Sequence, residues 1–527
     1  MGSRFFAHTL ISVLFAWPIV VWGYFINHVG LKVAVSNCSM TMKLPLTIFS
    51  VNLSDALICL GLTLLVGVGL NILSLLTVFF RDAQKPMLGG SRFGNMIDAI
   101  KAKLFAKQGL WLGHAFGRPI RLGGDESALV VAPTGSGKTT SLAVPNILTF
   151  NGSIIVNDSK GEIYDLCART MQKRGTRCYL FAPLDLNSCG YNPFSFIRLD
   201  PEHKLKDLIL LAEALIPNGN TDNSSFWQDN SQKLFICLSL YVLELEEGAT
   251  LGKLFDVAHQ EDLRKWFKLT VKSRIVEDPL FAQLSTDIIS GFKETIANII
   301  TSFRTSIKSL AIPSVQRSTS KNNLYLDKLR DEKFLICCKF PPNNCDHIKP
   351  LITALWAQLI DIQTRSNRPK GHSLLFLMDE FGNLGQLNAL AQGMTYLRSY
   401  RIRLMVIVQH LGQITERYGQ HAARSFKSAK AKVIYALTDL EDARYISEMM
   451  GKQTVKVTNR NRHSGGATSN ESLNDQWTER PLMQADEILR LRQNEGLLLL
   501  EGRYPFKIKK KPWFKNQKFK KMLRGKK

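Results

Sequence analysis

The sequence has little cysteine, and its cysteines are not spaced for metal binding or for disulfides. Nine cysteines occur in 527 residues, an odd number, and none forms the C-x-x-C spacing of a zinc ligand pair. Several lie in apolar runs such as residues 334–340, where cysteine behaves as a small hydrophobic side chain. This pattern excludes a disulfide framework and a zinc site, and it indicates a reducing compartment.

Acidic residues are also scarce. There are 44 Asp and Glu against 68 Lys and Arg, which gives a formal net charge of +24 and favours a polyanionic partner such as nucleic acid or an anionic membrane face. Residues 507–527 contain eleven basic residues and no acidic one, and such a tail is ordinarily a solvated, disordered extension. Trp513, Phe514 and Phe519 alternate with its lysines, so contact with single-stranded nucleic acid or anionic lipid remains an alternative.

Charge is absent from two long stretches near the N-terminus, residues 9–27 and 56–80. The second has 25 residues, about 37 Å as a helix, which is enough to cross a bilayer core of about 30 Å. A soluble core helix is rarely apolar on every face over that length. For the first stretch a cleaved signal peptide is an alternative, because Arg4 precedes it and Ala34-Val35-Ser36 offers a small-residue site.

Basic residues orient these two expected transmembrane helices. Residues 81–107 contain six Lys or Arg, whereas only Lys32 and Lys43 lie between the two stretches. The positive-inside rule then places both termini and the bulk of the chain in the cytoplasm, with a short external loop. We therefore expect residues 1–85 to form a membrane anchor.

A glycine-rich loop follows a short apolar strand expected at Ser127–Val131. Ala132–Thr140 reads A-P-T-G-S-G-K-T-T, the phosphate-binding pattern G-x-x-x-x-G-K-[ST] with alanine at its first position. Glycines let successive backbone N–H groups face a phosphate at the positive end of the following helix. Lys138 would reach the β- and γ-phosphates of ATP, and the Thr139 hydroxyl would bind Mg²⁺. The residues expected to bind ATP are Thr134, Gly135, Ser136, Gly137, Lys138, Thr139 and Thr140.

A second apolar strand, expected at Ser373–Met378, ends in Asp379 and Glu380, which matches the Walker B pattern. Asp379 would hold Mg²⁺ through its water shell, and Glu380 would act as the general base that activates the attacking water. This pair lies 241 residues after Lys138, farther than a minimal nucleotide-binding core requires. The distance predicts an inserted domain.

The intervening sequence indicates that the insert is helical. Apolar residues recur at three- and four-residue spacing over Lys206–Leu215, Ser225–Glu247, Leu251–His259 and Pro279–Leu310, and strands resume near residues 333–340. The predicted fold class is α/β, a RecA-like P-loop nucleotide-binding domain with an inserted all-α domain, preceded by two transmembrane helices. The expected boundaries are 86–203 and 317–505 for the nucleotide-binding domain, 204–316 for the insert and 506–527 for the basic tail.

Polar residues downstream of the acidic pair could respond to the γ-phosphate. A strand expected at Arg403–Val408 ends in Gln409, where motor folds of this type can place a γ-phosphate sensor, although polar residues commonly end strands. Arg398 forms a cluster with Arg401 and Arg403. One of them could act as an arginine finger in a neighbouring subunit, or the cluster could simply be solvated.

Asp158 lies in the motif Asn157–Glu162, directly after a strand expected at Ser153–Val156. Ligands of open α/β sheets gather at such carboxyl strand ends, so this carboxylate could belong to the site. A helix-capping acid in a turn explains it equally well, and the sequence leaves both interpretations open.

Together these motifs resemble the coupling-protein family of type IV secretion and conjugative transfer systems, over nearly the whole chain. The resemblance implies a homohexameric ring with a central channel in the bacterial inner membrane. It also assigns Gln409 as the γ-phosphate sensor and Arg398 as the arginine finger, while Ala132 departs from the glycine of many relatives. The matching elements are the two N-terminal stretches, Ala132–Thr140, Asp158–Glu162, Tyr191-Asn192-Pro193, Phe226-Trp227, Leu374–Gly385, Val408-Gln409 and Arg480-Pro481-Leu482.

The function implied by this resemblance is an ATP- and Mg²⁺-dependent motor. It would pass DNA, expected to be single-stranded and bound to a relaxase, or effector proteins to components of the secretion channel. One alternative is a receptor that docks protein effectors only, with nucleotide as a structural ligand. Another is a DNA translocase for chromosome partition, which would be expected to have more membrane spans, a long linker and a C-terminal winged-helix domain.

Overall fold

The computed structural model describes residues 69, 88–217, 222–245, 248–340, 345–366, 369–381, 390, 393–394, 396–462 and 471–524. Apart from Gly69, both expected membrane spans lie outside the described residues. Within the described part of the chain, no helix combines the length and the apolar composition needed to cross a membrane. The chain divides into two units, Met1–Gly90 and Ser91–Lys527, and the second unit contains every element described below.

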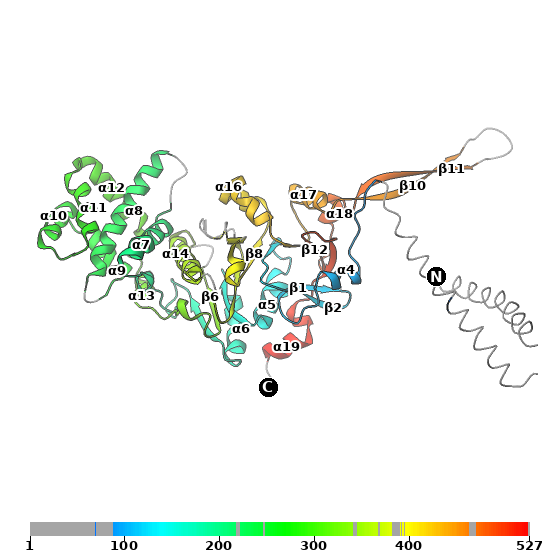
Figure 1. Ribbon diagram of the computed structural model, residues 1–527, viewed down its shortest axis with the longest axis horizontal. Coiled ribbons are helices and arrows are strands. Elements are labelled where there is room, and N and C mark those ends of the chain that lie inside the picture. The colour runs from blue at the N-terminus through cyan, green and yellow to red at the C-terminus, as the bar shows by residue number, and fades with distance from the viewer. Residues whose placement is uncertain are drawn as a thin grey trace, which may run out of the picture. The chain divides into compact units, whose positions relative to one another are not determined.

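An eleven-stranded sheet forms the centre of this second unit (Figure 1), in the order β2-β1-β13-β12-β9-β3-β8-β7-β4-β6-β5. The strands from β9 to β5 are parallel, and β12, β13, β1 and β2 extend the sheet in antiparallel pairs. The parallel strands are β3 (Ala128–Val131), β4 (Gly152–Asn157), β5 (Arg177–Phe181), β6 (Phe334–Cys338), β7 (Ser373–Met378), β8 (Ile402–Val408) and β9 (Ala431–Ile434). The antiparallel strands are β1 (Leu110–Ala115), β2 (Arg118–Leu122), β12 (Glu495–Leu500) and β13 (Phe506–Lys509).

Alternate residues of the central strands enter two separate hydrophobic cores. Leu129 and Val131 of β3 belong to one core, and Ala128 and Val130 belong to the other, as the two-residue period of a strand requires. Both faces of the parallel strands are therefore covered, which explains their nearly continuous apolar composition. In Figure 1, α5 (Val144–Thr149), α6 (Glu162–Gln172) and α19 (Gln517–Arg524) lie on one side of the sheet, and α14 (Cys345–Thr364), α16 (Gly412–Lys427), α17 (Leu440–Met450) and α18 (Ala485–Leu489) lie on the other.

Helices α7 to α13 intervene between β5 and β6, as the helical periodicity predicts. Helix α7 starts at Pro201 because Asp200 caps it by accepting from the N–H of His203, and proline fits the first helical turn. The stretch expected at Pro279–Leu310 is helical, but the expectation of one continuous helix is wrong, because the helix is interrupted at Gly291. There the backbone is extended, and an added Cβ would lie 2.8 Å from the Asp287 carbonyl oxygen. The helices are α7 (Pro201–Leu215), α8 (Asp222–Leu243), α9 (Leu251–Ala258), α10 (Leu263–Ser273), α11 (Pro279–Ser290), α12 (Lys293–Ser306) and α13 (Pro313–Thr319).

A long two-stranded ribbon, β10 (Lys452–Arg462) and β11 (Glu471–Pro481), forms a separate sheet. Figure 1 shows it extending away from the helices that cover the main sheet. Residues 463–470 lie outside the described residues, whereas residues 471–473 belong to β11.

The C-terminal basic segment is folded, so the expectation of a solvated, disordered extension is wrong for residues 506–524. Phe506 and Ile508 of β13 are buried and Lys507 and Lys509 are exposed, because a strand sends alternate side chains to opposite faces. Farther along, Phe519 of α19 is 1% exposed and packs edge-on against Trp111, with ring centroids 5.1 Å apart. Lysines on one face and apolar residues on the other therefore allow a basic segment to fold.

Candidate functional site

The glycine-rich loop lies at the carboxyl end of β3, at the centre of the sheet. Gly135 and Gly137 have φ angles of +76° and +80°, in the left-handed region that favours glycine. A Cβ on Gly135 would meet nothing within 4 Å, so conformation rather than space requires glycine there. The N–H of Ala132 donates to the Val408 carbonyl of the neighbouring strand β8 at 2.8 Å, which shows that alanine is accommodated at the first position.

The segment after the loop is helical but irregular. Residues Thr139–Ala143 form a π-turn, and α5 follows it directly; Pro145 has no N–H to continue the ladder. The buried Asn146 side chain accepts from the Trp111 N–H at 2.7 Å and donates to the Trp111 and Leu142 carbonyls, both at 2.9 Å. The two hydrogen bonds to Trp111 fix the helix, and with it the loop, against strand β1.

The structure brings Thr139 and Asp379 into direct contact. Strand β7 ends at Met378 and is separated from β3 only by β8, so both carboxyl ends reach the same edge of the sheet. The Thr139 hydroxyl donates to Asp379 Oδ2 at 3.0 Å. Burial raises the pKa of Asp379, and the nearby Lys138 opposes that rise. A hydroxyl beside a carboxylate is a donor set that suits Mg²⁺, which prefers oxygen ligands.

Lys138 is buried between the loop and the acidic pair. It is 7% exposed, and its Nζ lies 3.7 Å from Asp379 Oδ1 and 3.9 Å from Glu380 Oε1. Its ammonium has no hydrogen-bond partner among the described residues. Buried polar groups are almost always hydrogen-bonded, so this ammonium fits a site whose missing partner is a phosphate oxygen. The residues present therefore fit ATP with Mg²⁺.

Glu380 has a constrained backbone and a held side chain. Its φ is +54°, which is uncommon for a residue with a Cβ and costs about 1–3 kcal/mol where the surrounding structure enforces it. Ser159 Oγ donates to Glu380 Oε2 at 2.7 Å, and Asn157 Nδ2 donates to the Asp379 carbonyl at 2.8 Å. These two contacts from the end of β4 orient the acidic pair.

Asn157 and Ser159 are therefore site residues that the sequence reasoning did not assign. The available signal was their position in the motif Asn157–Glu162, directly after the strand expected at Ser153–Val156. Neither residue type indicates on its own that it would contact the acidic pair.

Asp158 caps a helix, which is one of the two roles that the sequence leaves open for this carboxylate. Its carboxylate accepts from the N–H groups of Gly161, Ile163 and Tyr164 at 2.9–3.1 Å, at the start of α6. Burial is the main cause that raises its pKa to about 6, and the three N–H donors oppose that rise. Asp158 thus shapes the turn that presents Ser159 to Glu380.

Gln409 and Arg398 lie at opposite ends of β8. Gln409 follows the strand directly, where Val408 pairs with Val131 beside the loop, and its N–H donates to Gln413 Oε1 at 3.0 Å. Arg398 precedes the strand and forms an ion pair of 2.8 Å with Glu126, with 56% of its side chain exposed. A seven-residue strand spans about 20 Å, so Arg398 is remote from this chain's own loop and faces outward.

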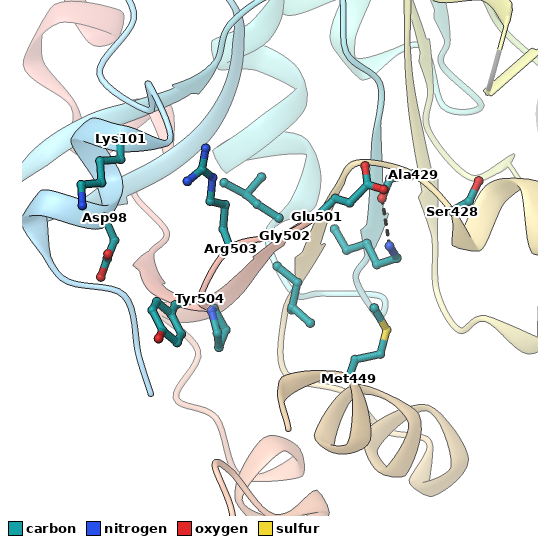
Figure 2. Close-up of a pocket in the computed structure, with 13 residues that line it drawn as sticks. Asp98, Lys101, Ser428, Ala429, Met449, Glu501, Gly502, Arg503 and Tyr504 are labelled. Atoms are coloured by element: carbon teal, nitrogen blue, oxygen red, sulfur yellow. Dashed lines mark hydrogen bonds between the residues drawn. The ribbon is translucent and has the colours of Figure 1, made fainter. Parts of the chain in front are cut away.

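A pocket of about 760 Å³ lies apart from these residues (Figure 2). It is lined by the turn Glu501–Pro505, by Asp98 and Lys101 of α4 (Met96–Lys101), and by Lys432 at the start of β9. Because β9 and β3 are parallel, the start of β9 faces the edge opposite the glycine-rich loop. None of the expected nucleotide-site residues lines this pocket.

Comparisons with known proteins identify relatives over most of the chain. The family described as Type IV secretory system Conjugative DNA transfer matches residues 87–527. Protein VirD4 of Rhizobium radiobacter is 30% identical over 437 residues, which cover 80% of this chain and 62% of that protein. Conjugal transfer protein TraG of Escherichia coli is 26% identical over 400 residues, covering 71% of this chain and 63% of that protein. The chain thus matches slightly less than two thirds of the length of each of these two relatives.

Solved structures of a bacterial conjugative coupling protein share the fold. The unbound form of TrwBdeltaN70 superposes with a TM-score of 0.63 at 18% identity, covering 81% of this chain and 94% of that one. TrwB in complex with ADP and Mg²⁺ superposes with a TM-score of 0.61 at 18% identity, covering 81% of this chain and 95% of that one. The likeness confirms a RecA-like α/β fold with a helical insertion.

Proposed function

Because the chain belongs to the coupling-protein family of type IV secretion and conjugative DNA transfer, we propose that it is an ATP-driven motor and substrate receptor. It recruits DNA or nucleoprotein and passes it to the secretion channel. The observation that carries this proposal is the convergence of Lys138, Thr139 and Asp379 at one edge of the sheet.

The hydrolytic mechanism follows from the positions of these side chains. Lys138 and the loop N–H groups bind the phosphates. Thr139 and Asp379 would hold Mg²⁺, which would neutralise charge on the phosphate oxygens. Glu380 takes the proton of the attacking water as general base, with its carboxylate oriented by Ser159.

Two further residues connect hydrolysis to movement. Gln409, at the end of the strand between the loop and the acidic pair, responds to the γ-phosphate. Arg398 lies at the far end of that strand and is half exposed, a place from which it reaches the site of a neighbouring subunit as an arginine finger. Sites shared in this way require an oligomer, for which we propose a homohexameric ring.

The proposed setting is the bacterial inner membrane, with the bulk of the chain in the cytoplasm. Residues 9–27 and 56–80 would anchor the ring there by two transmembrane helices. The net charge of +24 suits a nucleic-acid substrate, and a relaxase-bound single strand is the proposed form. Relaxase or effector proteins and the channel components are the proposed protein partners.

ATP turnover of the full-length protein tests this function. We expect single-stranded DNA to stimulate turnover, with Lys138→Ala as the inactive control at each DNA concentration. Turnover that does not respond to any DNA would favour a receptor for protein effectors. Stimulation by duplex DNA alone would favour a translocase of the chromosome-partition kind.

A further inference from the structure

Lys510 reaches the glycine-rich loop from the far end of the sequence. Strands β9 and β13 both run antiparallel to β12, so they share one direction, and the residue after β13 lies at the same edge of the sheet as the loop. There Lys510 Nζ donates to the Ser136 carbonyl at 3.0 Å. Ser136 stands between the two glycines with positive φ, Gly135 and Gly137.

Lys510 is buried without a counter-charge. It is 8% exposed, its Nζ lies 4.3 Å from the centre of the fully buried Tyr435 ring, and it forms no ion pair with any carboxylate of the described residues. The cation–π contact offsets part of the cost of burial. Burial also lowers the pKa of Lys510 to about 8. A buried ammonium without an anion is costly, and a phosphate would supply that anion.

The neighbouring lysines do not share this environment. Lys509 and Lys511 are exposed, whereas Phe506, Ile508 and Lys510 are buried at alternate positions. Lys510 thus occupies a position where the strand pattern expects an apolar residue. Its placement follows from the pairing of β13, and a general excess of basic charge does not explain it.

We propose that Lys510 is a second lysine of the nucleotide site, which pairs with the phosphates of a nucleoside di- or triphosphate held by the loop. The inference rests on the proposed function, because it needs a phosphate at the loop. An ammonium has three N–H donors, and the hydrogen bond to Ser136 uses one of them. Lys510 strengthens nucleotide binding and takes no part in the chemical step, because the proposed general base Glu380 follows β7, which lies on the opposite side of β3 from β13.

Four variants of the full-length protein test the proposal, with the affinity for a fluorescent ATP analogue and the KM and kcat for ATP as readouts. Lys510→Met and Lys510→Gln both remove the charge, and Gln keeps an N–H donor for Ser136. We expect both to weaken binding and raise KM about tenfold, with kcat within a factor of two. Lys510→Arg, which keeps the charge, should bind the ATP analogue within about threefold of the wild-type affinity. Lys509→Met, the matched surface control, should have the affinity and the KM of the wild type.

The outcomes separate this inference from the proposed function. If wild-type protein binds no nucleotide, the proposed function fails. If wild type binds and folded Lys510→Met binds equally well, only the role of Lys510 fails. Full affinity in Lys510→Gln would show that a hydrogen bond alone suffices, and a fall in kcat at unchanged KM would place Lys510 in the chemical step; either result overturns the proposal.

Discussion

The hydroxyl of Thr139 donates a hydrogen bond of 3.0 Å to the carboxylate of Asp379, across 240 positions of sequence. The contact exists because β3 and β7 are separated by a single strand in a parallel sheet. All of α7 to α13 lies between the two residues along the chain, yet the insertion does not displace either strand from the sheet. The proposed Mg²⁺ ligands Thr139 and Asp379 and the neighbouring Lys138 thus lie at the ends of strands that are buried on both faces.

Replacement of Glu380 by Gln should separate nucleotide binding from hydrolysis. The amide retains the shape of the side chain but cannot accept the proton of the attacking water. We expect ATP binding within about threefold of the wild type and a fall in kcat of about 10²–10⁴-fold. Single-turnover hydrolysis measures the chemical step, and the exposed Glu501→Gln serves as control. A variant that hydrolyses ATP at the wild-type rate would exclude Glu380 as the base.

The proposed arginine-finger role of Arg398 predicts complementation between two inactive variants. Arg398→Ala should bind ATP normally and lose about 10³-fold in kcat, and Lys138→Ala should not bind it. When the two are mixed and reassembled, some sites combine an intact loop from one subunit with an intact arginine from the other. Activity of the mixture should therefore exceed the sum of the separate proteins.

Lys430→Ala is the matched control for that experiment, because Lys430 pairs with the same Glu126 carboxylate at 2.8 Å. Loss of that pair alone should leave turnover unchanged. Mixtures that show only additive activity would argue against a site shared between subunits.

The packing of the C-terminal segment predicts a large stability effect at Phe519 and a small one at Phe514. Phe519 is 1% exposed and Phe514 is 45% exposed. Truncation of a buried phenylalanine to alanine typically costs about 3–5 kcal/mol, whereas Phe514→Ala should change the free energy of unfolding by less than about 0.5 kcal/mol. Urea unfolding of the full-length variants measures both. Equal stability of the two would mean that α19 is not part of the core.

Nucleotide affinity should fall at alkaline pH if Lys510 pairs with phosphate. Its pKa is lowered to about 8 by burial, and a bound phosphate favours the charged form. The charge is therefore present below pH 8 in the free protein, and affinity declines as the pH rises through 8. The groups that face the ammonium are the Ser136 carbonyl and the Tyr435 ring, and burial raises the pKa of Tyr435, so it stays neutral.

Titration of ATP binding from pH 7 to 9.5 measures this decline. The Lys510→Met variant should lack the part of the slope that centres near pH 8. If wild type and variant show the same pH profile, the charge of Lys510 does not contribute to binding.

The elements that the sequence predicts best are those that are buried on both faces. Strand β7 was expected at Ser373–Met378 and has those bounds, because a short apolar run before two carboxylates has few other interpretations. The break at Gly291 was missed, since the apolar spacing continues across it and only the extended backbone interrupts the helix.

The site was predictable only where a residue type carries its own chemistry. Lys138, Thr139, Asp379 and Glu380 could be proposed together because phosphate binding, Mg²⁺ binding and general-base catalysis each call for one of those groups, and the structure brings the four side chains together. Ser159 could not be assigned to Glu380, because their contact depends on the pairing of β4 with β7.

Lys510 could not be singled out either, because it is one of four lysines within residues 507–511, of which it alone is buried. Its contact with the loop follows from a strand that joins the sheet late in the chain. The only trace of this pairing in the sequence is the alternation of buried and exposed positions along residues 506–510. The alternation is hard to recognise because the last buried position is itself a lysine.

The most direct test of the central claim is Mg²⁺-dependent ATP binding and turnover by full-length protein, compared between wild type and Lys138→Ala. Lys138 is the buried ammonium without a hydrogen-bond partner among the described residues, so its removal should abolish both activities while the protein stays folded and inserts into membranes as before. Wild-type turnover should also stop when Mg²⁺ is chelated. Retained ATP turnover in Lys138→Ala would contradict the assignment of the loop and the acidic pair to one nucleotide site.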